Sequence, residues 1–175
     1  YFDSKYYADC GFAGAPATQE EKDTLVSWMR ENATGMIVEK NDAMQLYNVH
    51  INDMHTGIIC RATTSEANTS WRGLGGYTMY GFSITGCTVG LQLDDVTYGG
   101  CPSVNGLIRP VNGGVAIHLT EKFDTTMLFN GVRIEGRPAC ALKNEGRGKI
   151  SGVNMTFCSW EAGQPAVVTR GGDLF

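Results

Sequence analysis

The stretch that decides the fold is Tyr80-Gly81-Phe82-Ser83-Ile84, which is followed after a short polar turn by Gly90-Leu91-Gln92-Leu93. Each half alternates apolar with small or polar residues, a pattern typical of a strand with one buried face. The same two halves recur after Asp42, with leading apolar residues 33, 25, 25 and 21 residues apart: Val49, Phe82, Leu107, Val132 and Val153. Repeats of this length predict a solenoid, in which each turn buries its apolar face against its neighbours.

The composition fits one folded domain of modest charge. The chain has 175 residues and a formal net charge of −4, so we do not expect a nucleic-acid-binding surface. The 23 glycines fall between apolar pairs, where they indicate turns rather than a flexible linker. No apolar run is long enough to cross a membrane. The chain opens on Tyr1, so we expect a processed start or one cut from a longer chain.

The six cysteines are expected to be mostly buried thiols. Cys87 and Cys158 stand at the same position of the repeat, five residues after Phe82 and Val153, in copies three turns apart. Strands stacked at about 4.8 Å would separate them by about 14 Å. A disulfide requires Cα atoms within about 7 Å. Disulfides between neighbouring turns, such as Cys60 with Cys87 or Cys140 with Cys158, stay open but would join different slots. No cysteine and histidine spacing indicates zinc.

The first part of the chain, residues 1–35, differs from the repeat and is expected to carry one helix. Thr18 stands three residues before Glu21, which is the sequence pattern of a capping box. Apolar residues then recur at helical spacing, so a helix is predicted from about Gln19 to Glu31. We expect this helix to cover the open end or a flank of the solenoid formed by 36–175.

The repeat residues Tyr80-Gly81-Phe82-Ser83-Ile84 and Gly90-Leu91-Gln92-Leu93 resemble the coils of the pectin-lyase-like superfamily over roughly residues 36–170. The resemblance implies an all-β fold, a right-handed parallel β-helix with three sheets. The superfamily includes polysaccharide lyases, glycoside hydrolases of the polygalacturonase and lacto-N-biosidase types, epimerases and phage tailspikes. It implies a secreted or cell-surface protein that acts on a poly- or oligosaccharide. The low charge and the lack of a long apolar run predict that the protein has neither nucleic-acid nor membrane partners.

The chain is short for such a protein. We therefore expect a fragment or one subunit of a larger assembly, with the remainder of the β-helix or a partner subunit at the open C-terminal end.

The second half of each repeat resembles the strand that lines the substrate cleft in the superfamily. Its outward positions are predicted to be Ile59, Gln92, Ala116, Ala141 and Val168, continued two residues later by Arg61, Asp94, His118, Lys143 and Arg170. These groups would form a polar ladder at about 4.8 Å intervals that binds substrate. His118 beside Asp94 would be held ready for proton transfer, and the cations would suit carboxylates or sulfates on a glycan. The alternative is that these positions are polar because they face water.

Asp94 and Asp95 are the sharpest candidates for catalysis, because glycoside hydrolysis uses one carboxyl group as acid and a second as nucleophile or base. The pair superficially resembles the Asp-Asp of polygalacturonases, but it follows the apolar strand here instead of preceding it, and the other motifs of that family are absent. Adjacent strand residues also point to opposite faces, so a turn that ends the strand is the alternative interpretation.

Glu161 is a further candidate acid, and the preceding Trp160 would either stack on a sugar ring or pack under a loop. Hydrolysis is favoured over elimination, because paired acids are easier to find here than a cluster of acids that could hold calcium. Lyases of the superfamily use an arginine or lysine base with calcium, which Arg61, Lys143 or Arg170 would supply. A hydrolase would need no cofactor. The rival hypothesis is a non-catalytic glycan-binding or structural β-helix, as in adhesins and tailspikes.

Overall fold

The structure is a computed structural model, and it describes residues 2–9, 14–39, 44–62, 77–95, 103–158 and 163–170. Residues 63–76, between the first two copies of the repeat, lie outside these residues, as do Trp160 and Glu161. Two helices, α1 (Ser4–Asp9) and α2 (Gln19–Asn32), precede most of the strands.

The strands form three sheets. Sheet A contains β1 (Phe2–Asp3), β4 (His50–Asn52), β7 (Ser83–Thr85), β10 (Leu107–Arg109), β13 (Arg133–Glu135) and β16 (Thr156–Cys158). Sheet B contains β2 (Thr34–Val38), β5 (Thr56–Cys60), β8 (Val89–Leu93), β11 (Val115–Leu119), β14 (Cys140–Asn144) and β17 (Val167–Thr169). Sheet C contains β3 (Met44–Tyr47), β6 (Tyr77–Tyr80), β9 (Ser103–Val104), β12 (Thr126–Asn130) and β15 (Lys149–Val153).

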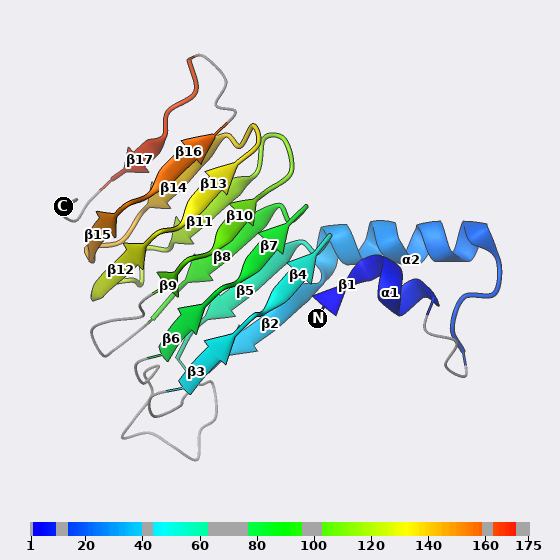
Figure 1. The fold of residues 1–175 in the computed structure, drawn as a ribbon. Coiled ribbons are helices and arrows are strands. Elements are labelled where there is room, and N and C mark those ends of the chain that lie inside the picture. Colours follow the sequence, from blue (N-terminus) through cyan, green and yellow to red (C-terminus); the bar gives the residue numbers. More distant parts are fainter. Residues whose placement is uncertain are drawn as a thin grey trace.

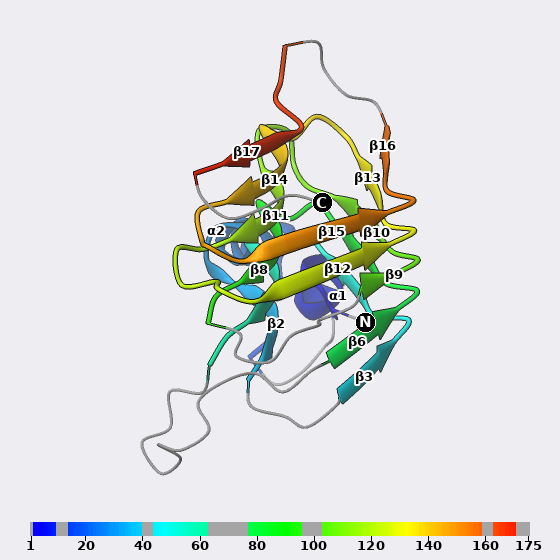
Figure 2. The same ribbon diagram turned by 90° about the vertical axis from the view of Figure 1, so that its left-hand side faces the viewer.

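The chain passes through sheets B, C and A in turn, and every described pair of neighbouring strands is parallel. The three sheets form the three sides of a prism (Figures 1 and 2). Buried apolar side chains fill its interior. The predicted three-sheet parallel β-solenoid is therefore confirmed. Residues Phe2–Asp3 also add a strand to sheet A beside β4, so the segment before the first repeat takes part in the solenoid.

The core consists of columns of identical or similar side chains, because residues in register stack on consecutive turns. On sheet A, Ile51, Ile84, Ile108 and Ile134 form one such column and are fully buried. Their neighbours on the same strands, such as Arg133, point to solvent. The predicted alternation of buried and outward residues holds for these strands.

The repeat alignment was wrong by one residue in the third copy. Leu107 lies in register with Ser83 and not with Phe82. Gly106 is the residue in register with Phe82 on the next turn. The Phe82 ring occupies the space beside it, so a Cβ on Gly106 would overlap that ring. A glycine therefore stands where the other copies have an apolar side chain, because the bulky residue one turn earlier already occupies the volume.

The fifth copy is also shifted. Val153 lies in register with the outward Asn130 of β12 and is 47% exposed, so it is no core residue. The position that the sequence interpretation gave to Val153 is occupied by Met155. Thr156 pairs with Arg133 and donates its backbone N–H to the carbonyl of Val132, so Met155 lies in register with Val132. β10 pairs in regular register with β7 and β13 and ends at Arg109, and Pro110 begins the connection to β11.

The corner between sheets C and A repeats one backbone conformation. Asn48, Gly81, Asn105, Gly131 and Asn154 all have φ between 51° and 65°. Consecutive members are linked by the ladder, because the N–H of Gly81 bonds to Val104 and that of Asn105 bonds to Asn130. Only glycine and asparagine adopt this left-handed region readily, which explains why these two residue types alternate at this corner.

Helix α2 begins with the predicted capping box. The Thr18 hydroxyl accepts a hydrogen bond from the Glu21 N–H at 3.2 Å, and the Glu21 carboxylate accepts one from the Thr18 N–H at 3.0 Å. The helix spans Gln19–Asn32, one residue longer than expected. Backbone hydrogen bonds from His55 to Met29 and from Thr56 to Ala33 attach its C-terminal end to sheet B.

The expectation that α2 covers the solenoid was wrong. The helix projects away from the stack and packs along α1, and none of its residues is fully buried (Figure 1). Trp28 remains 57% exposed. The apolar positions that predict an amphipathic helix therefore face α1 and solvent, and only Met29 near the C-terminal end packs against the core. None of the described helices has the length and apolar character of a membrane-spanning segment.

The cysteines that the structure describes are free thiols, as expected. Cys60, Cys87 and Cys140 are buried, and Cys158 is half-buried. Burial raises the pKa of Cys87 to about 11 and raises that of Cys140. Cys158 lies in register with Glu135 and so belongs to the outward row of sheet A, a different slot from Cys87.

Candidate functional site

The outer face of sheet B carries two parallel rows of side chains. The central row lies in the middle of the strands and contains Ile37, Ile59, Gln92, His118, Lys143 and Val168. The terminal row lies just beyond the strand ends, where the backbone ladder continues, and contains Glu39, Arg61, Asp94, Thr120, Glu145 and Arg170. Five of the predicted substrate-binding residues and Asp94 thus lie on one face.

The predicted ladder was wrong in register. His118 pairs with Gln92 and Lys143 pairs with His118, so both belong to the central row and not beside Asp94 in the terminal row. Ala116 and Ala141, which were assigned to the outward positions, are fully buried.

The small residues at these positions have a packing reason. Gly35, Gly57 and Gly90 occupy the same column as the two alanines. A Cβ on Gly35 would come within 2.6 Å of Ile51, and one on Gly90 within 2.5 Å of Ile108. The isoleucine column of sheet A fills this corner of the core, so this column of sheet B faces inward and accepts only small side chains.

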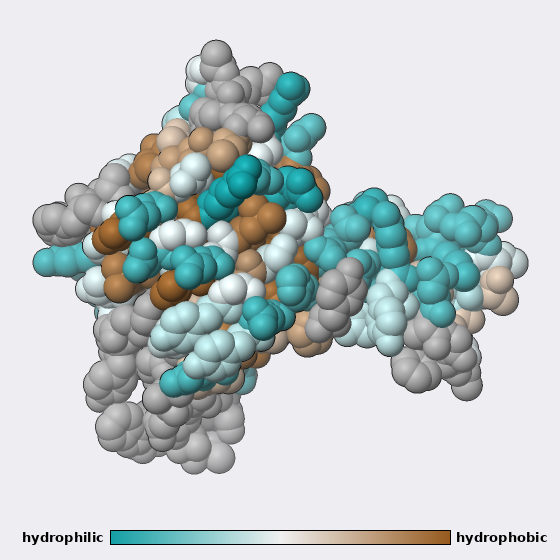
Figure 3. Space-filling view, viewed as in Figure 1, coloured by the Kyte–Doolittle hydropathy of each residue, from teal (hydrophilic) through white to brown (hydrophobic). Residues whose placement is uncertain are grey.

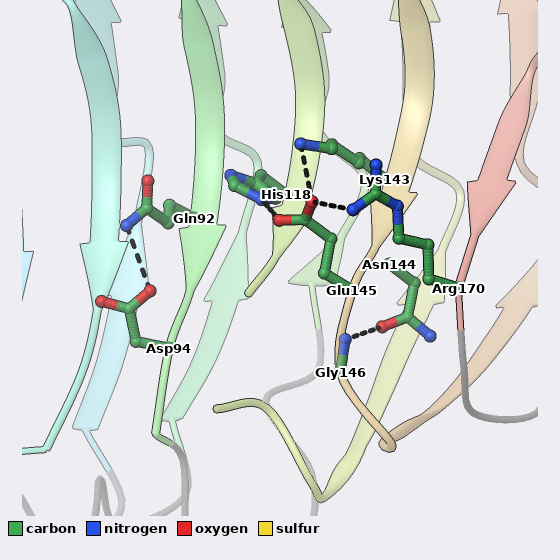
Figure 4. A network of polar contacts seen from close by, with 8 residues as sticks. All are labelled: Gln92, Asp94, His118, Lys143, Asn144, Glu145, Gly146 and Arg170. Atoms are coloured by element: carbon green, nitrogen blue, oxygen red, sulfur yellow. Dashed lines mark hydrogen bonds and ion pairs between the residues drawn. The ribbon is translucent and has the colours of Figure 1, made fainter. Parts of the chain in front are cut away.

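Glu145 is the centre of the polar network on this face (Figure 4). One of its oxygens, Oε2, accepts a hydrogen bond from His118 Nε2 at 2.8 Å. The other, Oε1, lies 2.9 Å from Lys143 Nζ and 3.9 Å from Arg170 Nη1. Three groups from β11, β14 and the end of β17 therefore converge on one carboxylate from the turn after β14.

This arrangement stabilises the ionised form of Glu145. The hydrogen bonds from His118 and from Lys143 lower the pKa of Glu145 from 4.5 to about 2. The same contacts fix the imidazole and the ammonium group in place. The result is a cluster in which three N–H-bearing side chains surround one ionised carboxylate.

Asp94 lies one turn before Thr120 in the terminal row. Gln92 Nε2 donates a hydrogen bond of 3.1 Å to Asp94 Oδ1, so these two side chains share the outer face (Figure 4). Asp95 follows it, and both are half-buried. The structure thus joins Asp94 to Gln92, and it joins His118 to Glu145 and not to Asp94.

Arg61 is engaged at the other end of the terminal row. Its guanidinium Nη2 lies 2.9 Å from Glu39 Oε1, and its Nε donates to the same oxygen at 2.9 Å. The described residues of the two rows therefore include three carboxylates and three cations: Glu39, Asp94 and Glu145 against Arg61, Lys143 and Arg170. Its charge is balanced rather than strongly positive.

Glu145 and Glu39 were missed by the sequence interpretation. A consistent count would have found Glu145, because it follows Lys143 by two residues as Asp94 follows Gln92. Thr120 was missed as well, and its hydroxyl oxygen is buried without a hydrogen-bond partner within the described residues. In the same part of the chain, no group of three or more histidine, cysteine, aspartate or glutamate side chains lies close enough to hold a metal ion.

Comparison with known proteins yields no match for this chain among protein-family models, curated proteins or solved structures.

Proposed function

We propose that the chain is a carbohydrate-active β-helix protein whose outer face on sheet B binds an extended glycan. The observation that carries this proposal is the polar terminal row, joined on three consecutive strands by Gln92, His118 and Lys143 of the central row, which places donors and acceptors at intervals of about 4.8 Å. Sugar hydroxyl groups both donate and accept hydrogen bonds, so an elongated polyhydroxyl ligand matches such a surface. The likeness of the coils to the pectin-lyase-like superfamily belongs to this proposal and supports the same ligand class.

The charged side chains on the outer face of sheet B indicate how much charge the glycan carries. Each cation of the face lies near a carboxylate, as in the pairs Arg61–Glu39 and Lys143–Glu145. A densely sulfated chain would meet these carboxylates at close range, whereas a neutral or weakly acidic glycan would not. We therefore propose a neutral or weakly acidic polysaccharide, met outside the cell or at its surface.

Affinity electrophoresis in gels that contain neutral, uronate-bearing and sulfated polysaccharides tests this proposal. We expect retardation by at least one neutral or weakly acidic polymer, and a clear reduction in the Lys143→Ala and Gln92→Ala variants. Lys149→Ala is the matched control, because Lys149 is an exposed lysine on sheet C. Equal retardation of all four proteins would place binding elsewhere, and no retardation by any polymer would reject the proposal.

Hydrolysis is the second candidate function, and one observation favours it. Asp94 and Glu145 lie in the same row two turns apart, which places their backbones about 9.6 Å from each other. The two carboxyl groups of inverting glycosidases are about 6.5–9.5 Å apart, a separation that side chains on backbones at this spacing can reach if they lean toward each other. Glu145 would be the ionised partner and Asp94 the acid, with Asp95 and Glu161 as the other carboxylates named by the sequence.

The release of reducing ends from a polysaccharide that the protein binds separates catalysis from binding. Asp94→Asn should abolish the release and preserve retardation in the gel. Binding without products would leave the non-catalytic β-helix, as in an adhesin or a tailspike, as the function. Release of unsaturated uronates would instead indicate elimination, in which Arg61, Lys143 or Arg170 acts as base and calcium as cofactor.

A further inference from the structure

The outer face of sheet C carries two tyrosines in register on consecutive strands, here called the tyrosine pair. Tyr47 ends β3 and lies beside Tyr80, which ends β6. Their rings are stacked, with centroids 5.2 Å apart and planes inclined by only 10°. Tyr47 is 60% exposed and Tyr80 is 38% exposed. Weakly hydrophilic side chains, drawn pale, gather over these two strands, so the pair belongs to an aromatic surface that is open to solvent (Figure 3).

One face of the Tyr47 ring is covered and the other is open. Consecutive strands are spaced by about 4.8 Å, close to the distance between stacked rings, so Tyr80 covers the face of Tyr47 that points along the stack. On the opposite side, β3 is the outermost described strand of sheet C. The high exposure of Tyr47 agrees with this edge position. Its second face can therefore receive a flat, apolar surface of a ligand.

The Tyr47 ring is held in place before a ligand binds. Its hydroxyl group donates a hydrogen bond of 2.5 Å to Gln45 Oε1, two residues earlier on the same outward face. Together with the stacking on Tyr80, this contact restrains both the plane and the tip of the ring. A ligand that stacks there orders little of the protein on binding, which lowers the entropic cost of association.

Polar groups border the ring. Gln45 uses its carbonyl oxygen for Tyr47, and its Nε2 amide group makes no hydrogen bond within the described residues. Thr78 lies in register with Gln45 on the next turn and is half-buried. The site thus combines N–H donors with hydroxyl oxygens that can accept. The strands β3, β6 and β9 contain no charged residue.

A neutral sugar ring has the properties that this site matches. A pyranose with equatorial hydroxyl groups carries C–H groups on its two faces and hydroxyl groups around its rim. Its apolar face suits the open face of Tyr47, and its hydroxyl groups can both accept from Gln45 and donate to Thr78. A charged ligand would find no counter-charge on these strands. A proline ring is also apolar, but a proline residue has no hydrogen-bond donor.

We propose that the tyrosine pair binds a neutral saccharide, with one sugar ring stacked on the open face of Tyr47. Gln45 Nε2 donates to a hydroxyl group of the same ring. The site lies on sheet C, on a different side of the prism from the polar rows of sheet B. It is a second saccharide site and does not depend on those rows.

Isothermal titration with cellohexaose, hexaproline and sorbitol tests the ligand class. In cellohexaose every ring substituent is equatorial, hexaproline offers apolar rings without hydroxyl groups, and sorbitol offers hydroxyl groups without a ring. The Gln92→Ala background removes a contribution from sheet B. We expect cellohexaose to bind at millimolar concentration and the other two compounds to bind about tenfold more weakly or less. No binding of cellohexaose, or equal or tighter binding of either other compound, would overturn the proposal.

Variants in the same background assign the binding to Tyr47. Tyr47→Ala should weaken the binding of cellohexaose about tenfold, because the stacking surface is lost, whereas Tyr47→Phe keeps the ring and should stay within about threefold. Tyr6→Ala is the matched control, because Tyr6 is an equally exposed tyrosine, 61% exposed, on α1. It should bind as the background chain does. Equal affinities of the Tyr47→Ala and Tyr6→Ala variants would reject the assignment.

Saturation-transfer NMR gives a readout that does not depend on the alanine variant. In an otherwise deuterated chain with protonated tyrosines, saturation of the aromatic protons should pass to the C–H protons of bound cellohexaose. Tyr47→Phe should reduce this signal while it preserves affinity, because the ring that meets the sugar is then deuterated. An undiminished signal would place the sugar elsewhere. Gel retardation that depends on Gln92 and Lys143, without a tyrosine signal, would reject this site and leave the sheet B proposal standing.

Discussion

The ring of Phe82 lies over the α-carbon of Gly106, one turn further along the solenoid, in the space that a side chain on Gly106 would need. Phe82 is 3% exposed, so the ring has no route to solvent. The two residues form one unit of packing in which the volume of the first dictates the absence of a side chain on the second.

Gly106→Ala should therefore destabilise the fold by about 1–3 kcal/mol, since it overpacks a full core. Urea unfolding followed by circular dichroism measures the loss. Phe82→Leu in the Gly106→Ala background should recover part of the stability, because the smaller side chain vacates the contested space. Additive losses in the double-mutant cycle would contradict the packing relationship.

The left-handed backbone conformation at the corner between sheets C and A predicts which substitutions of Asn105 reduce stability. Asn105→Gly should be tolerated, whereas Asn105→Val should cost about 1–2 kcal/mol, because a β-branched side chain is strained at the φ of 51° found there. Thermal unfolding of both variants distinguishes the two effects. Asn130→Val is the control, since Asn130 is an exposed strand residue without positive φ. A valine tolerated equally well at both positions would show that the corner conformation is not a constraint.

Glu145 predicts a pH dependence of stability. Its pKa is lowered to about 2 in the folded chain, from 4.5. A lowered folded-state pKa contributes stability above pH 4.5, and this contribution is lost as the pH falls through the interval from about 4.5 to about 2. Glu145→Gln should therefore lower the melting temperature at pH 7 and make little difference near pH 2.

Glu121→Gln, which alters an exposed turn residue, is the control for this series. Its melting temperature should follow that of the unmodified chain throughout. If Glu145→Gln lowers the melting temperature equally at pH 7 and pH 2, the cluster around Glu145 does not stabilise its ionised form.

The cysteines predict an order of reactivity. In a background with Cys10→Ser and Cys101→Ser, Cys158 should react first with iodoacetamide at pH 8, because it is the half-buried thiol. Cys87 should react slowly, since burial shields it and raises its pKa to about 11. Mass spectrometry of tryptic peptides over time measures both rates. Modification of Cys87 as fast as Cys158 would show that this part of the core opens readily.

The capping box of α2 predicts a local effect. Thr18→Ala removes the acceptor for the Glu21 N–H and should weaken the helix by about 1 kcal/mol. Because the helix projects from the stack, we expect faster amide exchange within α2 and an unchanged melting temperature of the solenoid. Thr24→Ala, which leaves the capping box intact, is the control. A lowered melting temperature of the whole chain would show that α2 and the sheets unfold together.

Local alternation was enough to predict the sheets but not their alignment. Residues such as Ile84 and Val132 follow from the two-residue period of a strand. The identity of the residue opposite them depends on the length of each corner, and the corners between sheets A and B differ: they comprise 53–55, 86–88, 110–114 and 136–139. In the third copy Val115, Ile117 and Leu119 alternate, so Ala116 and His118 both lie between apolar residues, and choosing the first of such positions placed His118 and Lys143 two positions away from their true row.

Gly106 and Ala116 were missed for a different reason. Their small size is set by Phe82 and by the isoleucine column, which are distant in sequence and meet them only after the chain has wound. The polar network shows the same limit: counting along the sequence could have placed Glu145 on this face, but its contacts with both His118 and Lys143 follow only from the stacking of the turns. Side-chain partners across turns require the register, which the period alone does not supply.

Because the strands of all three sheets are in parallel register, one complete circuit of the chain is the length that can be inserted or deleted without disturbing the remaining strands. Removing one residue from a strand such as β12 would turn Met127 and Phe129 outward, whereas removing a complete circuit through sheets B, C and A would join two ends that already match. Length in such an architecture can change by whole circuits, so natural variants should differ by blocks of roughly two dozen amino acids rather than by single ones.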